Sequence, residues 1–129
     1  MKKCYLIFIA LVLFFACDDI PNSNLIGKWQ LKTVEKNGIE TPVDTVWYNF
    51  QSESVFAVQV YFSHQDSVLI IRGLRTQEEN VISIMLEVEP DPEILDWNRF
   101  DRLFTVDKVT KKNLILISEE GYKYSFIKF

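Results

Sequence analysis

Apolar and polar residues alternate in short runs along most of the chain, and residues that favour turns separate the runs. In the segment 26–34, for example, Trp29, Leu31 and Thr33 would share one face, while the polar residues between them would share the other. This period of two is typical of a β-strand with one face in water, whereas no long stretch shows helical spacing. The pattern predicts eight strands, at about residues 26–34, 45–51, 54–62, 67–73, 81–88, 102–109, 113–118 and 122–128.

The number and brevity of these strands indicate how the sheet is arranged. Short, half-buried strands joined by hairpin-length connections leave two unpaired edges unless the sheet closes on itself. We therefore expect one all-β domain over residues 25–129, an eight-stranded antiparallel up-and-down barrel. The interior of such a barrel is either filled by side chains or just wide enough for one small ligand. Two strands, with VLII at 68–71 and LILI at 114–117, are apolar on both faces, which predicts that something covers their outer sides.

One long connection, EPDPEILDWNRFD at residues 89–101, is unusually apolar for a loop. It should hold a short helical turn near 92–97, because Asp91 and the proline after it are typical of a helix start. A lid or plug that folds back onto the barrel would explain its apolar residues, of which Trp97 is the largest. The alternative, which we prefer, is that the turn covers the outside of a doubly apolar strand such as VLII.

The first residues differ from the rest of the chain. Two lysines precede a run of twelve almost wholly apolar residues that ends at Ala16, which is the outline of a signal peptide. A run of this length is too short to span a bilayer, so residues 1–16 should be removed. Cleavage there would make Cys17 the first residue, an arrangement that resembles the lipobox of bacterial lipoproteins, whose cysteine carries acyl chains. The alternative is a plain secreted protein whose cysteine is discarded or paired.

Lipidation at Cys17 would place the protein in the cell envelope. Cys4 would leave with the signal peptide, and a lone cysteine at an exported N-terminus is explained better by a lipid than by a disulfide. Residues 17–24 would then form a lipidated tether, and two or more acyl chains would anchor it stably to the membrane. Asp18 and Asp19 resemble a surface-export signal in some lipoproteins and an inner-membrane retention signal in others. Within the envelope, we expect the outer membrane or the cell surface.

Composition narrows the range of partners. Two of the 14 basic residues lie in the predicted signal peptide, so 12 basic and 18 acidic residues remain and the formal charge becomes −6. A domain with this charge would on average repel nucleic acid, which we do not expect as a partner. The remaining chain also keeps three Trp, four Tyr and seven Phe. This richness in rings favours a β fold with an aromatic interior or a cavity lined by rings.

Both ends of the domain resemble a known family. The tripeptide GKW stands at the start of the first strand and is similar to the Gly-x-Trp that opens lipocalin barrels, in which the tryptophan closes the bottom of the cup. With the leader and the terminal YKYSFIKF, the chain resembles the small lipocalin-like lipoproteins of Gram-negative gut anaerobes. The resemblance implies that residues 35–45 form the loop that overhangs the mouth. The last strand has no arginine to stack on Trp29, which leaves Lys123 or Lys128 for this contact.

If the barrel is hollow, its rings would line a ligand site. Register decides which residues these are: a three-residue loop at 51–53 puts Tyr48 and Phe56 on one face, whereas a two-residue or four-residue loop would turn the latter away. A packed, solid core is the alternative for all of them. The candidate ligand-binding residues are Trp29, Tyr48, Phe50, Phe56, Val58, Arg72, Trp97 and Tyr124.

Arg72 is the one charged residue in this set. It alternates with Val68 and Ile70, so if those two point inward, its guanidinium lies inside the barrel or at the rim. There it could hold the carboxylate or phosphate head of a ligand. The alternative is an arginine that merely extends from a strand end into solvent.

Candidate chemistry is sparse. His64 is the only histidine and lies in a predicted exposed turn, and there is no second imidazole and no mature thiol beyond Cys17 to complete a zinc site. The carboxylates of the 89–101 connection could supply a glycosidase-like pair, but a solvated acidic loop explains them as well. No nucleophile elbow or phosphate loop is present. We expect no enzymatic activity, no metal and no cofactor.

The sequence therefore supports two hypotheses of different kinds. The first is a lipid-anchored, lipocalin-like barrel that binds a small, largely apolar ligand without transforming it, with long loops controlling entry. The second is a solid barrel whose outer surface docks on an envelope protein or inhibits a protease, for which the doubly apolar strands would be the contact surface. A void lined by Tyr and Phe would favour the first, and a filled interior with an exposed apolar strip would favour the second.

Overall fold

The computed structural model describes residues 22–97 and 99–129, which are almost entirely β. The predicted signal peptide, Cys17 and most of the predicted tether lie outside the described residues. Within the described part of the chain, no helix is long and apolar enough to traverse a bilayer. The elements in order are α2 (Asn22–Leu25), β1 (Gly27–Lys36), β2 (Ile39–Pro42), β3 (Val46–Phe50), β4 (Val55–Phe62), β5 (Ser67–Glu78), β6 (Val81–Leu86), β7 (Asp101–Val109), β8 (Asn113–Ser118) and β9 (Lys123–Lys128).

Eight of these strands form a closed antiparallel barrel. Strand β1 pairs with β3 on one edge and with β9 on the other, so the first and last strands of the sheet meet. In this closing pair, Val34 lies opposite Tyr124 and Leu31 lies opposite Phe126. The predicted eight-stranded, lipocalin-like barrel is confirmed, and closure leaves none of the eight strands with a fully free edge.

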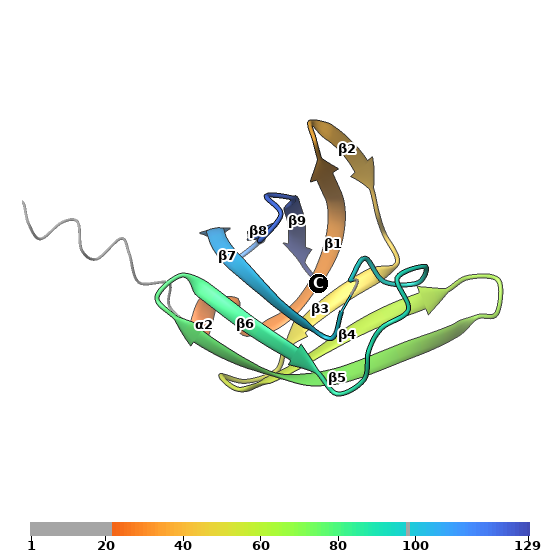
Figure 1. Ribbon diagram of the computed structural model, residues 1–129, viewed down its shortest axis with the longest axis horizontal. Helices are drawn as coiled ribbons and strands as arrows, with labels where there is room; N and C mark the ends of the chain where they lie inside the picture. The colour runs from red at the N-terminus through yellow and green to blue at the C-terminus, as the bar shows by residue number, and fades with distance from the viewer. Residues whose placement is uncertain (1–21, 98) are drawn as a thin grey trace, which may run out of the picture.

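The barrel has two different ends. The connections 37–45, 63–66, 87–100 and 119–122 lie at one end, which we call the mouth. The other end, where β1 begins and β9 finishes, is called the bottom. In Figure 1 the long connection between β6 and β7 folds back toward β3 and β4. This connection therefore lies over the mouth rather than along the outer wall.

The predicted loop 35–45 is mostly a hairpin. Strand β1 runs on to Lys36 and turns back through Asn37 and Gly38, whose φ angles of 55° and 81° fit a type I′ turn. Strand β2 then pairs with the end of β1, and Figure 1 shows this hairpin projecting beyond the rest of the barrel. The segment therefore stands at the mouth, as the resemblance implied, but as a two-stranded hairpin in place of a long loop.

A bulge in β1 changes which residues face inward. The register shifts between Leu31 and Thr33 where β1 pairs with β9, so one extra residue interrupts the alternation. Trp29, Leu31 and Val34 are consequently buried, while Thr33 is only half-buried. The prediction that Thr33 shares the inner face is wrong, because alternation cannot reveal where a bulge falls.

Trp29 closes the bottom of the barrel as the family resemblance implied. Its indole is fully buried, and Nε1 donates a hydrogen bond to the carbonyl oxygen of Leu25 at 2.8 Å. The ammonium of Lys128 lies 4.5 Å from the ring centroid and also donates to the Ile26 carbonyl oxygen at 2.9 Å. Of the two lysines considered for this stacking role, Lys128 fills it.

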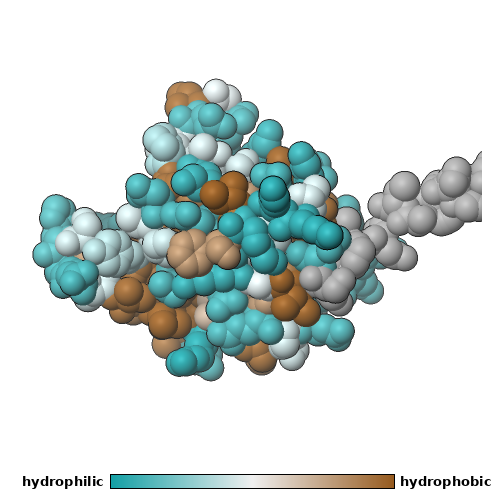
Figure 2. All heavy atoms as spheres, turned by 180° about the vertical axis from the view of Figure 1, so that it is seen from behind, coloured by the Kyte–Doolittle hydropathy of each residue, from teal (hydrophilic) through white to brown (hydrophobic). Residues whose placement is uncertain are grey.

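The doubly apolar strands are not covered as expected. Val68 and Ile70 of β5 are about half exposed on the outer face, and no segment of the described chain lies over them. Two further apolar side chains face outward, Leu74 farther along β5 and its partner Met85 on β6. Figure 2 shows apolar residues gathered along the lower part of this view of the molecule. The other such strand, β8, keeps its outward Ile115 and Ile117 partly buried.

Candidate functional site

The predicted aromatic residues meet inside the barrel. Tyr48 and Phe50 of β3 lie opposite Val58 and Phe56 of β4, and all four are buried. Their register puts Tyr48 and Phe56 on the same face, as predicted. The loop itself is displaced by one residue from the predicted 51–53, because Gln51 bonds to Val55 and three residues, 52–54, lie between them. Tyr124 of β9 joins them from the other side of the barrel and is also buried. These positions form one continuous cluster of rings.

Trp97 enters this cluster from outside the sheet. It belongs to the connection between β6 and β7, is only 1% exposed, and packs on Phe56 and Phe104 with centroid distances of 6.4 and 6.0 Å. Its Nε1 donates a hydrogen bond of 2.8 Å to the hydroxyl of Tyr48. The preferred interpretation, a turn that covers the outside of VLII, is therefore wrong. The connection plugs the barrel because its largest apolar residue gains more burial inside than on an open wall.

The predicted helical turn near 92–97 is present, as one turn only. The amide of Leu95 donates to the Asp91 carbonyl oxygen at 3.0 Å, the spacing of one helical turn, but the chain does not continue as a helix. Its side chains divide sharply between the two environments. Leu95 and Trp97 are buried, whereas the residues from Asp91 to Ile94 are exposed.

The inward placement of Arg72 is wrong. Its partner across the sheet is Ala57, and its side chain lies on the exposed outer face together with Val68 and Ile70. The opposite face of β5 points inward and ends at Arg75, which is 2% exposed. Both faces of this strand are apolar near residue 70, so alternation could not decide between them; pairing with β4 does.

Arg75 closes the bottom of the interior. Its Nε and one terminal nitrogen donate to the carbonyl oxygen of Ser52 at 2.9 and 2.6 Å, and the guanidinium lies 5.3 Å from the ring centroid of Phe50. Burial lowers the pKa of Arg75, and the nearby Glu53 partly offsets this. Arg75 therefore fills the interior at the end of the barrel opposite the mouth.

A second buried arginine lies just below the mouth. Arg102 of β7 is 6% exposed and lies between 5.1 and 5.7 Å from the ring centroids of Trp97, Phe104 and Tyr124. It donates to the hydroxyl of Tyr124 at 2.8 Å and to the main-chain oxygen of Asp96 at 2.7 Å. Arg102 was not among the predicted site residues, although its alternation with Phe104 and Val106 was a signal for its inward position.

Asp96 links the connection 87–100, which we call the plug, to the barrel wall. Its carboxylate accepts a hydrogen bond of 2.8 Å from the Tyr124 hydroxyl and forms a 2.8 Å ion pair with Lys36. Both partners of this ion pair are more than 40% exposed, so the pair stabilises the fold by only about 0–1 kcal/mol. Arg102 also forms a 3.2 Å ion pair with Glu120, whose own carboxylate is 41% exposed. Two cations, Lys36 and Arg102, and the carboxylates of Asp96 and Glu120 therefore lie together at the mouth.

The protonation states of this network follow from its burial. Burial raises the pKa of Tyr48 to about 12, although Arg102 acts in the opposite direction. Burial also raises the pKa of Tyr124, so both hydroxyls stay protonated and can donate at neutral pH. For Arg102, burial alone would lower the pKa, but the hydroxyls of Tyr48 and Tyr124 and the Glu120 carboxylate raise it overall. The guanidinium remains charged, which makes it a permanent donor.

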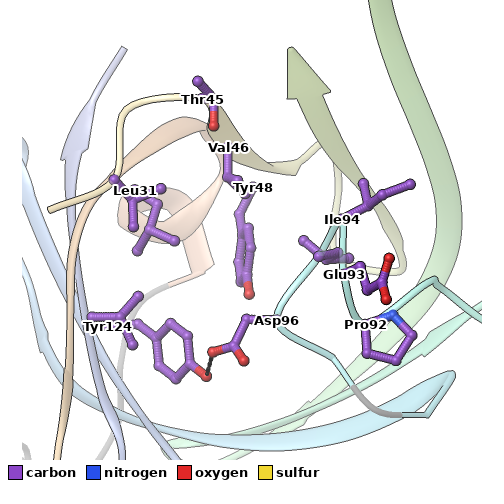
Figure 3. A pocket seen from close by; sticks show the side chains of 12 residues that line it. Leu31, Thr45, Val46, Tyr48, Pro92, Glu93, Ile94, Asp96 and Tyr124 are labelled. Atoms are coloured by element: carbon purple, nitrogen blue, oxygen red, sulfur yellow. Dashed lines mark hydrogen bonds between the residues drawn. The ribbon is translucent and has the colours of Figure 1, made fainter. Parts of the chain in front are cut away.

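A cleft opens at the mouth between the barrel wall and the plug. Its volume is about 280 Å³, and Figure 3 shows side chains from β1, β3, the connection and β9 converging on it. The wall contributes mostly apolar groups, and Tyr124 and Asp96 supply a hydrogen-bonded polar pair at one side. The lining residues are Leu31, Val34, Val43, Thr45, Val46, Tyr48, Pro92, Glu93, Ile94, Leu95, Asp96 and Tyr124.

Metal-ligating chemistry is not concentrated in any part of the described chain. No group of three or more His, Cys, Asp or Glu side chains in residues 22–97 and 99–129 is arranged to hold a metal ion. His64 is exposed in the turn between β4 and β5, as predicted. The arrangement at the mouth is instead an apolar cleft with a few convergent donors, which is typical of binding sites for small molecules.

Known proteins agree with this architecture. A family model described as a lipocalin-like domain matches residues 11–129. A crystal structure of a lipocalin-like protein from Bacteroides uniformis ATCC 8492 is 28% identical, with a TM-score of 0.73, and the match covers 82% of this chain and 99% of that one. An uncharacterised protein from Bacteroides eggerthii DSM 20697 is 25% identical, with a TM-score of 0.70 and coverage of 81% and 98%. No curated protein matches.

Proposed function

Because the chain belongs to the lipocalin-like domain family, we propose that it is a lipid-anchored protein of the cell envelope that binds a small, largely apolar molecule at the mouth of its barrel. It would hold this molecule without transforming it. The observation that carries the proposal is the cleft of about 280 Å³ between the wall of β1 and β3 and the plugging connection. An apolar cleft with a few fixed donors gains affinity by desolvation and orientation by hydrogen bonds.

The plug gives the site a way to enlarge. Trp97 fills the centre of the ring cluster, yet the connection that carries it is exposed over residues 91–94 and 99–100. If the connection moves outward, the cleft and the space left by the indole merge into one cup lined by Tyr48, Phe56 and Phe104. Loops over binding sites commonly open in this manner. The interior is filled and an apolar strip on β5 and β6 is exposed, which is the combination expected of the docking hypothesis. The binding proposal therefore takes the filled interior as the closed state of the protein.

Binding of a neutral apolar probe tests the proposal. We expect N-phenyl-1-naphthylamine to gain fluorescence on addition of the protein, and Ile94→Glu to weaken its binding at least about tenfold, because a carboxylate placed in the cleft must be desolvated. Ile94 is 37% exposed, so the change should leave folding intact. The matched control is Leu74→Glu, at a 64% exposed position on the outer wall, which should leave binding unchanged.

Two results would count against a binding site at the mouth. One is the absence of any fluorescence gain with the probe, together with no displacement by a broad panel of lipids and other apolar molecules. The other is equal weakening by Ile94→Glu and Leu74→Glu, which would mean that the probe adheres to the exposed apolar surface rather than to the cleft.

The second candidate function is docking on an envelope protein through the outer wall, including inhibition of a protease. The apolar side chains of Ile70, Leu74 and Met85, which are 50% or more exposed, favour it. A photo-crosslinking amino acid placed at position 74 in cells separates the two. Docking predicts one discrete crosslinked product that disappears in an Ile70→Lys variant, whereas ligand binding alone predicts none.

Anchoring is tested at the two cysteines of the leader region. We expect an alkyne analogue of palmitate to label the protein in its native host, and Cys17→Ala to abolish the label and move the protein from the membrane to the soluble fraction. Cys4→Ala is the matched control and should leave both unchanged, because this cysteine would be removed with the signal peptide. A labelled, membrane-bound Cys17→Ala protein would contradict the proposal.

A further inference from the structure

The plug contacts the barrel through two successive residues, Asp96 and Trp97. Trp97 places its indole among the rings of Tyr48, Phe56 and Phe104, with centroid distances of 6.0 to 6.4 Å, and its nitrogen donates to the Tyr48 hydroxyl. Trp97 and Leu95 are buried, while the neighbouring residues on the N-terminal side are exposed. The barrel therefore holds the connection mainly by one aromatic ring and the polar groups beside it.

Those polar groups converge on Asp96 from three different strands. Lys36 at the end of β1 and the Tyr124 hydroxyl of β9 each contact its carboxylate at 2.8 Å. Arg102 of β7 donates to its main-chain oxygen at 2.7 Å and to the Tyr124 hydroxyl at 2.8 Å. An ammonium, a guanidinium and a protonated hydroxyl are the donors that proteins use to hold carboxylates. Here the ammonium and the hydroxyl hold a carboxylate of the chain itself, while the guanidinium holds the main-chain oxygen of the same residue and the hydroxyl beside it.

We propose that Asp96 and Trp97 occupy, in the ligand-free protein, the site of a small aromatic carboxylate, and that this class of molecule is the ligand. Its ring would replace the indole in the cluster, and its carboxylate would replace that of Asp96 between Lys36, Tyr124 and Arg102. This inference rests on the proposed function, because it names the ligand of that same cleft.

The charges and the available space favour an acid over a neutral or cationic molecule. Displacing Asp96 leaves Lys36 without its ion-pair partner. Arg102 then loses the main-chain oxygen of Asp96 and keeps the Glu120 carboxylate, which is 41% exposed, and the Tyr124 hydroxyl. A ligand carboxylate would restore the balance, whereas an amine would add a third cation beside them. A second hollow of about 250 Å³, lined in part by Lys36, Asp96, Arg102 and Glu120, adjoins the plug and gives the carboxylate room to enter.

The plug then competes with the ligand. A protein whose binding-competent state is only partly populated shows a correspondingly weakened apparent affinity. Weakening the contacts of the Asp96 carboxylate should therefore strengthen binding of the aromatic carboxylate ligand. Asp96→Asn is the suitable change, because it removes the charge, keeps the shape, and acts on a side chain that is 46% exposed.

The test compares indole-3-propionate with its amide, indole-3-propionamide, by isothermal titration calorimetry on the purified full-length protein. We expect Asp96→Asn to bind the acid about tenfold tighter than the unchanged protein, and to prefer the acid to the amide by about tenfold or more. Adding Lys36→Met to Asp96→Asn should weaken the acid about tenfold and leave the amide unchanged. Lys36 is 41% exposed, so this change should not impair folding.

Two matched controls lie on β7, away from the mouth. Asp107→Asn and Lys108→Met repeat the same chemical changes at exposed positions, and neither should alter binding of the acid or the amide. If Asp107→Asn strengthens binding of the acid as much as Asp96→Asn does, the effect is one of net charge and the inference is overturned.

The remaining outcomes separate this inference from the proposed function. Equal binding of the acid and the amide in every variant, together with binding of N-phenyl-1-naphthylamine, overturns the aromatic acid as ligand and leaves an apolar binding site in place. If the acid, the amide and the neutral probe all fail to bind, both proposals fall. Tighter binding of the acid in Asp96→Asn, lost on adding Lys36→Met, supports the inference.

Discussion

Replacing Trp29 by alanine is expected to lower the free energy of unfolding by about 3–5 kcal/mol. The indole is fully buried at the bottom of the barrel, so its removal leaves a cavity that the surrounding sheet can fill only in part. The change also leaves the carbonyl oxygen of Leu25 without its hydrogen-bond donor and removes the ring under the Lys128 ammonium. Urea unfolding followed by far-ultraviolet circular dichroism at 25 °C measures the effect.

Trp47→Ala is the matched control for this prediction. Trp47 is the neighbour of Tyr48 but faces outward, is half-buried, and has an indole nitrogen without a hydrogen-bond partner among the described residues. Its removal should cost about 1 kcal/mol, mainly through lost contact with Phe129. Equal losses for the two tryptophans would show that the ring at position 29 does not close the barrel bottom.

Replacing Gly73 by alanine is expected to cost about 3 kcal/mol or more, a large effect for one added methyl group. A Cβ at this position would clash with the backbone carbonyl oxygen of Met85 and approach Cα of Leu86 at 3.0 Å. Both atoms belong to the backbone of β6, which cannot move without breaking its pairing with β5. Gly73 lies where β5 passes from pairing with β4 to pairing with β6, so the clash would disturb the corner of the barrel.

Gly121→Ala separates this clash from backbone strain. Gly121 has a φ of 89°, which an L-residue adopts at a cost, but no atom lies within 4 Å of the added Cβ. Its replacement should cost about 1–2 kcal/mol, from conformation alone. The same urea measurement applies to both variants. A loss at Gly73 no greater than that at Gly121 would contradict the close approach of the two strands.

Part of the candidate site could be predicted and part could not. Tyr48, Phe56 and Tyr124 were identified because strand alternation and a hairpin of fixed length set their face, and both are local properties. Trp97 was selected for its size, but its position inside the barrel was not the preferred interpretation. Lys36, Asp96 and Arg102 were missed as a group, because charged residues at strand ends and in loops normally face solvent.

The sequence by itself determined the strands, the closed barrel, Trp29 at the bottom and the aromatic interior. The strands, the closure and the aromatic interior follow from a period of two residues and from the need to pair strand edges, whereas the place of Trp29 was implied by the resemblance of GKW to the Gly-x-Trp of lipocalins. Only the tertiary structure decided that Arg75 rather than Arg72 points inward and that a bulge in β1 turns Val34 rather than Thr33 to the inner face. It also decided that the connection after β6 plugs the mouth. The physical reason is that these features depend on contacts between segments far apart in the chain. A strand that is apolar on both faces, or a loop with one large ring, has several local solutions of similar free energy, and packing selects among them.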